Sequence, residues 1–341
     1  MAEQDRSHAR PIGWGIVGTG AIAERFAADL AAVNGARRVA VLSRTLATAE
    51  TFASRQGFAV AQADPDVFYA LPQLDIVYIA TPYATHERFA LAAINAGRAV
   101  LVEKPLADTP LAARRIAEAA EQRGIFAMEA LWSRFLPAVA QAKRLIDAGA
   151  IGRIRQIDAE LAFAQTLDPQ TGQWNGRDAD PTLDLGVYPV SLALYFLGLP
   201  QRWRVERTRI AGAGAVSSAT VQLQWAGAQA SLSCGYDREG ANAMILRGEA
   251  GALRLDRHFL QAPAVTLFKG RGPALASNRV GRLADRLPLP GRKRIAAPPR
   301  GHGFTHEIEA AMAAMREGAT QSPIMPLHHS VATLEIMAAD R

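Results

Sequence analysis

The chain has 341 residues, of which 49% are hydrophobic and 21% are charged, and its formal net charge is +6. This composition is typical of a folded globular protein and argues against intrinsic disorder, and the length suits two domains. No stretch approaches the roughly 20 apolar residues that a membrane helix needs. Residues 1–11 are polar and lack an apolar core, so we interpret them as a leader and not as a secretory signal.

The chain contains one cysteine, Cys234. A single cysteine excludes a disulfide within the chain and offers no cysteine-based metal cluster, so we expect no metal ion. This usage fits the reducing cytoplasm, although an exported protein with few cysteines would look the same. The cytoplasm is the location that we predict.

The positive charge is concentrated in residues 269–300, where nine basic residues accompany a single acid, Asp285. The segment is also rich in proline and glycine and has no steady apolar period, which predicts a long solvated loop. It lacks interleaved aromatic residues, zinc-finger spacing and a helix-turn-helix pattern, so we expect no nucleic-acid partner. Steering of an anionic ligand is the alternative, and the role of this loop stays open.

The first part of the chain alternates short apolar runs with helical patterns. This alternation predicts a parallel sheet covered by helices on both faces, as in a Rossmann domain, which we place at residues 12–130. The expected strands are 12–17, 39–42, 76–80, 99–102 and 125–128, and the expected helices are 21–33, 45–55, 84–96 and 111–122.

After about residue 130 the rhythm changes to longer strand-like runs, several of which alternate apolar and polar residues. That alternation is typical of an antiparallel sheet with one solvated face, so we predict a second domain of α+β type at residues 131–341. The expected strands are 153–163, 202–210, 217–225, 228–234 and 242–247, and the expected helices are 137–148, 304–316 and 328–339.

The helices of this second domain suffice to cover one face of its sheet. If Val221, Leu223 and Trp225 point outward, the other face is apolar and needs a cover. A second copy of the same sheet is the simplest cover. We therefore expect a homodimer or a higher homo-oligomer.

A dinucleotide-binding fingerprint, Gly18-Thr-Gly20-Ala21-Ile22-Ala23, directly follows the first strand and opens the first helix. In such a turn the first glycine permits the tight bend, the second lets the backbone approach a pyrophosphate, and Ala23 permits close packing of helix on sheet. Free N–H groups at the helix start face the phosphates. We expect Gly18, Gly20, Ala21 and Ile22 to contact the cofactor, the alternative being an ordinary glycine turn.

The end of the second predicted strand indicates which dinucleotide is bound. Proteins that bind NAD usually place an acid there for the ribose 2′-hydroxyl, whereas this chain has Ser43 and Arg44. No carboxylate repels a 2′-phosphate, and the guanidinium of Arg44 can bind one in a bidentate manner beside Ser43. NADP is therefore preferred over NAD, although Arg44 as a simple surface arginine remains an alternative.

Two further motifs follow strands of the predicted parallel sheet. Thr81 and Pro82 end one strand, with His86 four residues after Pro82, and Glu103-Lys104-Pro ends the next. Rossmann ligands bind outside the carboxyl ends of the strands, so we expect all five residues beside the cofactor. His86 is equally suited to capping a turn.

Together these motifs resemble the glucose-fructose oxidoreductase / inositol dehydrogenase family (Gfo/Idh/MocA), and the resemblance covers roughly residues 12–340. The T-P-x-x-x-H and E-K-P spacing is its most specific feature. Residues 128–135 (MEALWSRF) and 184–189 (DLGVYP) look most like the branch of dimeric dihydrodiol dehydrogenases and NADP-dependent D-xylose dehydrogenases. The resemblance implies an α/β Rossmann domain followed by an α+β domain with a large, mostly antiparallel open sheet.

The resemblance also implies a catalytic pair, Lys104 and Tyr188, with Asp184 as a supporting carboxylate and Trp132 as a substrate platform. A phenol has a pKa of about 10, too high for a good base, but an adjacent ammonium favours the phenolate. Lys104 can supply that field and also bind the reacting oxygen. From the residues alone, Tyr188 and Trp132 are also compatible with core positions and Asp184 with a helix cap; the role of Arg134 is undecided.

These features predict an NADP-dependent oxidoreductase that transfers hydride to or from a sugar, a dihydrodiol or a related hydroxy or carbonyl compound. The alternative is a non-catalytic dinucleotide-binding regulator of the same fold. Residues 178–183 depart from the glycine-rich run that the family often has before the aspartate. The identity of the small-molecule substrate and the direction of the reaction are left open.

Overall fold

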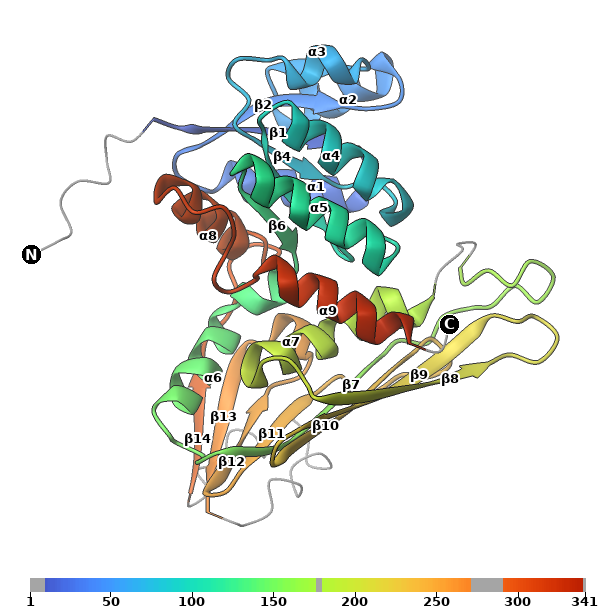
Figure 1. Cartoon of the computed structure of the whole chain (residues 1–341), viewed down its shortest axis with the longest axis vertical. Coiled ribbons are helices and arrows are strands. Elements are labelled where there is room, and N and C mark those ends of the chain that lie inside the picture. Colours follow the sequence, from blue (N-terminus) through green and yellow to red (C-terminus); the bar gives the residue numbers. More distant parts are fainter. Residues whose placement is uncertain (1–9, 176–179, 271–290, 340–341) are drawn as a thin grey trace, which may run out of the picture. The chain divides into compact units, whose positions relative to one another are not determined.

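The computed structural model describes residues 10–175, 180–270 and 291–339, and the chain packs into two compact units (Figure 1). The first comprises Met1–Trp132 and Arg300–Val331, and the second comprises Ser133–Pro299 and Ala332–Arg341. The sequence had assigned the whole of 131–341 to the second domain. The structure instead packs Arg300–Val331 with the Rossmann unit.

A six-stranded parallel sheet forms the centre of the first unit, in the order β3-β2-β1-β4-β5-β6. The residues of β1, β4, β5 and β6 are all buried, as expected for a sheet covered on both faces. Strand β3 was not predicted, because three half-buried residues carry no period. The strands are β1 (Ile12–Val17), β2 (Ala36–Leu42), β3 (Val60–Gln62), β4 (Ile76–Ile79), β5 (Ala99–Glu103) and β6 (Ala127–Ala130).

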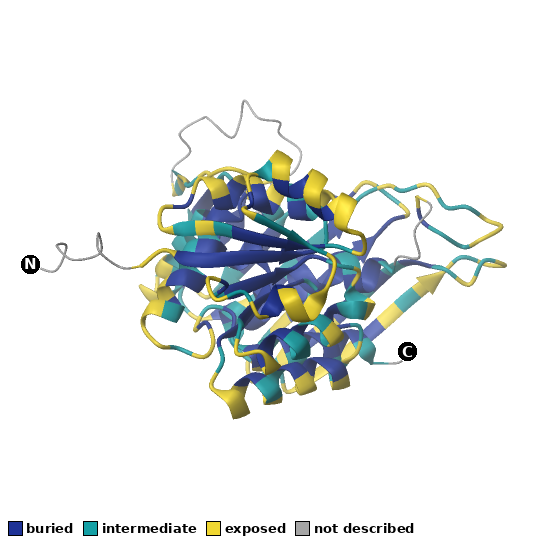
Figure 2. Ribbon diagram, turned by 90° about the horizontal axis from the view of Figure 1, so that it is seen from above, coloured by how far each residue is buried: buried dark blue, intermediate teal, exposed yellow. Residues whose placement is uncertain are grey.

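Helices flank this sheet on both faces, because right-handed crossovers lead outward from β1 in one direction and from β4 in the other. Threonine side chains cap α2 and α5 at their starts, and both helices end at a left-handed glycine. Figure 2 shows buried strands between helices whose outer turns are exposed. The helices are α1 (Ala21–Ala31), α2 (Leu46–Gln56), α3 (Pro65–Tyr69), α4 (His86–Asn95), α5 (Pro110–Arg123) and α8 (Thr305–Arg316).

One buried acid on α1 explains why the segment before α8 belongs to the first unit. The carboxylate of Asp29, 3% exposed, accepts hydrogen bonds from the backbone N–H of His302 (2.9 Å), Phe304 (2.9 Å) and Thr305 (3.3 Å). It therefore caps the first turn of α8, where helix N–H groups lack partners within the helix. No local sequence pattern predicts a cap that comes from 273 residues away.

An eight-stranded sheet forms the second unit, in the order β14-β13-β12-β11-β7-β10-β9-β8. Its pairs are antiparallel except β7–β10, and helices α6 and α7 pack on one face. This confirms the predicted fold class. The strands are β7 (Ile154–Ala162), β8 (Arg202–Arg209), β9 (Val216–Trp225), β10 (Ala228–Gly235), β11 (Met244–Gly248), β12 (Gly251–Leu255), β13 (Ala264–Lys269) and β14 (Arg292–Ala296). The helices are α6 (Pro137–Asp147), α7 (Val187–Leu197) and α9 (Leu327–Ala338), the last beginning in the first unit.

The face of this sheet opposite the helices is polar, so the condition under which we expected an apolar face, that Val221, Leu223 and Trp225 point outward, is not met. Val221 is 2% exposed and Leu223 is 1% exposed, and Trp225 donates through its indole N–H to the Gly198 carbonyl at the end of α7 (3.0 Å). A period of two fixes alternation but not which phase faces the helices. We call the other set of side chains the polar sheet face: Gln156, Asp158, Ser218, Thr220, Gln222, Gln224, Gln229, Ser231 and Ser233.

Part of the basic segment 269–300 is also a strand and not a solvated loop. Residues 292–296 form β14, which pairs with β13 and places Ile295 opposite Val265. The guanidinium of Arg294 donates to the buried carboxylate of Asp256 (2.8 Å). These long-range pairings outweigh the weak strand propensity of a basic stretch. The rest of the predicted loop, 271–290, lies outside the described residues.

The helices within the described ranges are too short or too polar to cross a lipid bilayer.

Candidate active site

The glycine-rich turn after β1 has two glycines that serve different purposes. Gly18 has a φ of +101°, and a Cβ at this position would lie 2.7 Å from the carbonyl oxygen of Ala80, so the turn itself demands glycine. Gly20 has no neighbouring atom within 4 Å of its Cβ position, so the chain's own packing does not demand glycine there. The open space in front of Gly20 fits a ligand that approaches the backbone closely.

The start of α1 is suited to an anion. Gly20 is its N-cap residue and supplies no side-chain hydrogen bond, so the first N–H groups, at Ala21 and Ile22, are not satisfied by a capping side chain. Helix dipoles place partial positive charge at such an end. These residues therefore fit the pyrophosphate of a dinucleotide.

The end of β2 lies beside this turn. The hydroxyl oxygens of Ser43 and Thr19 are 3.4 Å apart, and Arg44 is exposed and forms no hydrogen bond or ion pair with any described residue. A cavity of about 300 Å³ adjoins the turn and is lined by Thr19 and by residues of α2. The guanidinium of Arg44 is thus available for a phosphate at the ribose end of a dinucleotide.

His86 joins two of the strand-end loops. It is 1% exposed, its Nε2 lies 2.8 Å from the carbonyl oxygen of Thr81, and its Nδ1 lies 2.9 Å from that of Pro105. Burial lowers the pKa of His86, although the backbone contacts oppose this. Each ring nitrogen faces a backbone carbonyl, and the neutral ring donates to one of the two at a time, which gives His86 a holding role between the loops after β4 and β5.

Glu103 anchors the loop that carries Lys104. Its buried carboxylate accepts hydrogen bonds from the hydroxyl of Tyr78 and from the backbone N–H of Lys104 (3.0 Å). Burial raises the pKa of Glu103 to about 7, although the Tyr78 hydrogen bond and the Lys104 charge act in the other direction. Lys104 itself is half-buried at the carboxyl end of β5, at the same sheet edge as the glycine-rich turn and Pro82.

Asp184 and Tyr188 lie one turn apart in the second unit. Asp184 is half-buried in a π-helical turn (Thr182–Gly186), and Tyr188, 7% exposed, is in the first turn of α7. Pro189 is also in that first turn, where a missing N–H is tolerated. A Cβ on Gly186 would lie 2.6 Å from the terminal methyl of Met337 and 3.1 Å from Cys234 Sγ, so a larger residue would require these side chains to shift.

Two residues that the sequence did not single out lie on one side of Asp184, the second behind the first. The hydroxyl of Tyr236, at the end of β10, donates to Asp184 Oδ2 (2.6 Å), and the ring of Trp174 packs against Tyr236. Neither residue belongs to a motif, and 52 residues separate Tyr236 from Asp184. The sequence therefore carried no signal for this contact.

The two remaining candidates are largely buried. Trp132 is 9% exposed, and its ring centroid lies 5.6 Å from that of Phe304 within the first unit. Arg134, 1% exposed, donates to the Ser191 carbonyl of α7 and lies over the ring of Tyr195. Arg134 therefore supports the helix that carries Tyr188.

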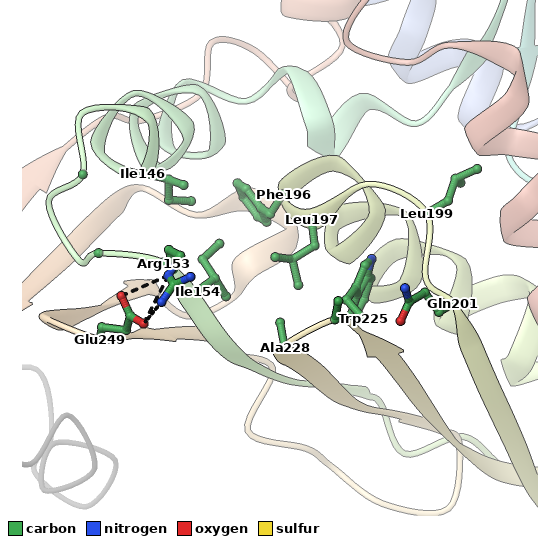
Figure 3. A pocket seen from close by; sticks show the side chains of 13 residues that line it. Ile146, Arg153, Ile154, Phe196, Leu197, Leu199, Gln201, Trp225, Ala228 and Glu249 are labelled. Atoms are coloured by element: carbon green, nitrogen blue, oxygen red, sulfur yellow. Dashed lines mark hydrogen bonds and ion pairs between the residues drawn. The ribbon is translucent and has the colours of Figure 1, made fainter.

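A further cavity lies elsewhere in the second unit. It has a volume of about 820 Å³ and is bordered by α6, the end of α7 and the β9–β10 turn (Figure 3). Its wall is mainly apolar, and the pair Arg153–Glu249 (2.9 Å) lies at one side. None of the predicted site residues lines it.

Within the described ranges, the protein has no group of three or more His, Cys, Asp or Glu residues that could hold a metal ion.

Two models of one known family match this chain over most of its length. The model of an oxidoreductase family with an NAD-binding Rossmann fold matches residues 12–130, and that of the GFO/IDH/MocA C-terminal domain matches residues 139–254. The chain belongs to the GFO/IDH/MocA oxidoreductase family. This confirms the resemblance that the T-P-x-x-x-H and E-K-P motifs indicated.

Several members of the GFO/IDH/MocA family are similar along nearly their full length. The mouse trans-1,2-dihydrobenzene-1,2-diol dehydrogenase is 28% identical over 96% of this chain and 95% of the relative. A D-xylose 1-dehydrogenase (NADP(+)) of Hypocrea jecorina is 28% identical over 95% of this chain and 90% of the relative. These are members of the branch that the sequence resembled.

Solved structures of the GFO/IDH/MocA family share the fold. A levoglucosan dehydrogenase in complex with NADH has a TM-score of 0.82 at 21% identity, covering 96% of this chain and 95% of that one. A 3-ketoreductase from Actinomadura kijaniata in complex with NADP has a TM-score of 0.78 at 23% identity, covering 97% and 96%. As a member of this oxidoreductase family, the chain pairs a dinucleotide-binding Rossmann unit with a large open sheet.

Proposed function

We propose that this protein is an NADP-dependent oxidoreductase that transfers hydride between the nicotinamide and a CH–OH or carbonyl carbon of a small polyhydroxylated substrate. The observation that carries the proposal is the position of Lys104, at the carboxyl end of β5 on the same sheet edge as the open Gly20 turn. Ligands of such sheets bind at this edge. The dihydrodiol and xylose dehydrogenases among the relatives support sugars or dihydrodiols as the substrate class.

NADP is the proposed cofactor because no carboxylate follows β2 to repel a 2′-phosphate, and the exposed Arg44 can bind one. When bound, the nicotinamide would accept hydride from an alcohol carbon or deliver it to a carbonyl carbon. Gly18, Gly20, Ala21 and Ile22 would hold the pyrophosphate, and Ser43 would assist Arg44. Thr81, Pro82 and Glu103 would border the nicotinamide end, with His86 behind them.

The residues of this chain would accept the substrate's hydroxyl proton and return it. In the oxidative direction Tyr188 would take the hydroxyl proton, because the ammonium of Lys104 favours its phenolate and also binds the reacting oxygen. In the reductive direction Tyr188 would return the proton to the same oxygen. Asp184 would be the supporting carboxylate for Tyr188. Trp132 would form a wall of the substrate pocket.

A non-catalytic regulator is the competing function. The family assignment and the dehydrogenases among the relatives favour catalysis. The test is a screen of the purified protein for NADP reduction and NADPH oxidation with aldoses, dihydrodiols and dicarbonyls, with Lys104→Met as a control. Turnover with one class that disappears in Lys104→Met supports the proposal. Tight NADP binding without turnover on any class would favour the regulator.

The polar sheet face is the proposed contact of a homodimer. Its serine, threonine and glutamine side chains are both donors and acceptors, so a two-fold axis lets the face hydrogen-bond to itself. Within the chain Gln222 already donates to Ser231 across neighbouring strands (2.9 Å).

The single cysteine, Cys234, is buried and supports the cytoplasm as the proposed location.

A further inference from the structure

Tyr236 follows β10 and is fixed by the backbone on both sides. Its N–H donates to the Ser217 carbonyl (2.8 Å), and its own carbonyl accepts from the Gln165 N–H (2.9 Å). The side chain is 4% exposed. The register of the sheet therefore determines where the phenol ring lies.

Trp174 packs on the Tyr236 ring, and the Tyr236 hydroxyl points at the carboxylate of Asp184. The Trp174 ring lies 5.5 Å from the Tyr236 ring between centroids, and the Trp174 indole N–H donates to the Val216 carbonyl (3.0 Å). Trp174 is 4% exposed and is thus itself held in place. The Tyr236 hydroxyl donates to Asp184 Oδ2 at 2.6 Å, a length typical of a hydrogen bond to an ionised oxygen.

The hydroxyl acts as a permanent donor. Burial raises the pKa of Tyr236, and the charge of Asp184 and the hydrogen bond to it raise the pKa further. The phenol therefore stays protonated over the range in which enzymes work, unlike the role proposed for Tyr188. A fixed donor favours the charged form of the carboxylate that it contacts.

We propose that Tyr236 is a positioning residue that orients the Asp184 carboxylate and keeps it ionised during the reaction proposed above, on which this inference rests. It acts through Asp184 and not on the substrate. The hydrogen bond presents the carboxylate in one orientation, one turn before Tyr188. Trp174 keeps the Tyr236 ring from turning away.

The test compares Tyr236→Phe, Asp184→Asn and the double variant. Tyr236→Phe retains the ring contacts with Trp174, so the fold is preserved. Tyr69→Phe is the matched control, because Tyr69 is a buried tyrosine of the first unit whose hydroxyl donates to the Phe89 carbonyl (3.2 Å). The carboxyl carbon of Asp184 is followed by NMR in protein labelled at aspartate, and the signal is assigned by its absence in Asp184→Asn.

We expect Tyr236→Phe to raise the pKa of Asp184 by about 1–2 units, since a hydrogen bond to a charged group is lost. The acid limb of the kcat/KM profile should move to higher pH by a similar amount, and Tyr69→Phe should change neither. In the Asp184→Asn background, Tyr236→Phe should cause no further loss of kcat/KM. An unchanged Asp184 pKa, or an acid limb that stays in place in active Tyr236→Phe enzyme, would overturn the proposal.

The NMR titration does not depend on turnover, so the two proposals fail in different ways. A raised Asp184 pKa in a protein that turns over no substrate would refute the proposed function and leave the Tyr236–Asp184 link standing. Active wild-type enzyme with identical titrations in wild type and Tyr236→Phe would refute the link alone.

Discussion

The Nδ1 atom of His86 lies 2.9 Å from the carbonyl oxygen of Pro105, the residue that follows Lys104. Because Nε2 lies 2.8 Å from the Thr81 carbonyl oxygen, one imidazole ties together the two loops at the cofactor edge of the sheet. The backbone directly after the proposed catalytic lysine is thereby fixed from α4. The position of Lys104 therefore depends on His86, which contacts the loop and not the substrate.

His86→Leu should reduce kcat by about tenfold to a hundredfold, because small displacements of a catalytic group have effects of this size. It should also cost about 1–3 kcal/mol of stability, since a buried carbonyl loses its hydrogen-bond donor. His86→Gln should recover part of both. Steady-state rates and thermal unfolding make the comparison, with the exposed His328→Leu as control. Wild-type rates in His86→Leu would show that the bridge does not position Lys104.

Tyr188→Phe keeps the ring and deletes only the hydroxyl, so folding and NADP affinity should survive. If Tyr188 exchanges the proton, turnover should fall by about 10²–10⁴-fold. Lys104→Met should do comparable damage, and the double variant should be little worse than either, because residues that act as one unit are not additive. Tyr195→Phe on the same helix is the control. Near wild-type turnover of Tyr188→Phe would remove this tyrosine from the mechanism.

Arg44→Ala should weaken NADP binding by about 1–3 kcal/mol, the size of a charge-assisted hydrogen bond, and leave NAD binding nearly unchanged. Titration of both cofactors into wild type and variant measures the difference. Arg37→Ala, at the opposite end of β2, is the matched control and should bind both cofactors as wild type does. Equal losses for NADP and NAD would refute the assignment of Arg44 to the 2′-phosphate.

Glu307 is fully buried on α8, and its carboxyl oxygens have no hydrogen-bond partner among the described residues. Burial raises its pKa, and the nearby carboxyls of Glu103, Asp29 and Glu129 raise it further. A raised pKa means that the folded state holds this proton more tightly than the unfolded state. Stability is therefore greatest below the usual pKa of a glutamate and falls as the pH rises toward the folded value.

Glu307→Gln should remove this dependence. The variant should be more stable than wild type at pH 8, by about 1.4 kcal/mol for each pH unit by which folding raises the pKa of Glu307. The difference in the free energy of unfolding should disappear at acid pH. Denaturant unfolding across the pH range measures it, with the exposed Glu317→Gln as control. Parallel curves for wild type and Glu307→Gln would contradict the prediction.

If the polar sheet face forms the dimer, light scattering at micromolar concentration should report twice the mass of the chain. Ser231→Glu adds a charge to this face in each subunit and would bury it without a partner, so it should shift the protein toward monomer. Gln122→Glu adds the same charge on α5 and should leave the mass unchanged. A wild-type monomer at this concentration would rule the dimer out.

Much of the fold, together with the glycine-rich turn and Lys104 of the candidate site, could be predicted from patterns within a few residues of the chain. Some features are local, because each depends on backbone geometry within a few residues. These are the helical and strand periods of the first 130 residues, the caps at Thr45 and Thr109, and the glycine turn at Gly18. Lys104 could be placed at the sheet edge from sequence, because the carboxyl ends of parallel strands share one edge.

What the tertiary structure alone decided involves partners far apart in the chain. The phase of β9 depends on which face meets α7, and β14 exists because β13 pairs with it. The cap of α8 by Asp29 and the bond from Tyr236 to Asp184 join residues 273 and 52 positions apart. A period or a motif encodes geometry over a few residues, whereas these contacts depend on burial and register that exist only once the sheets have formed.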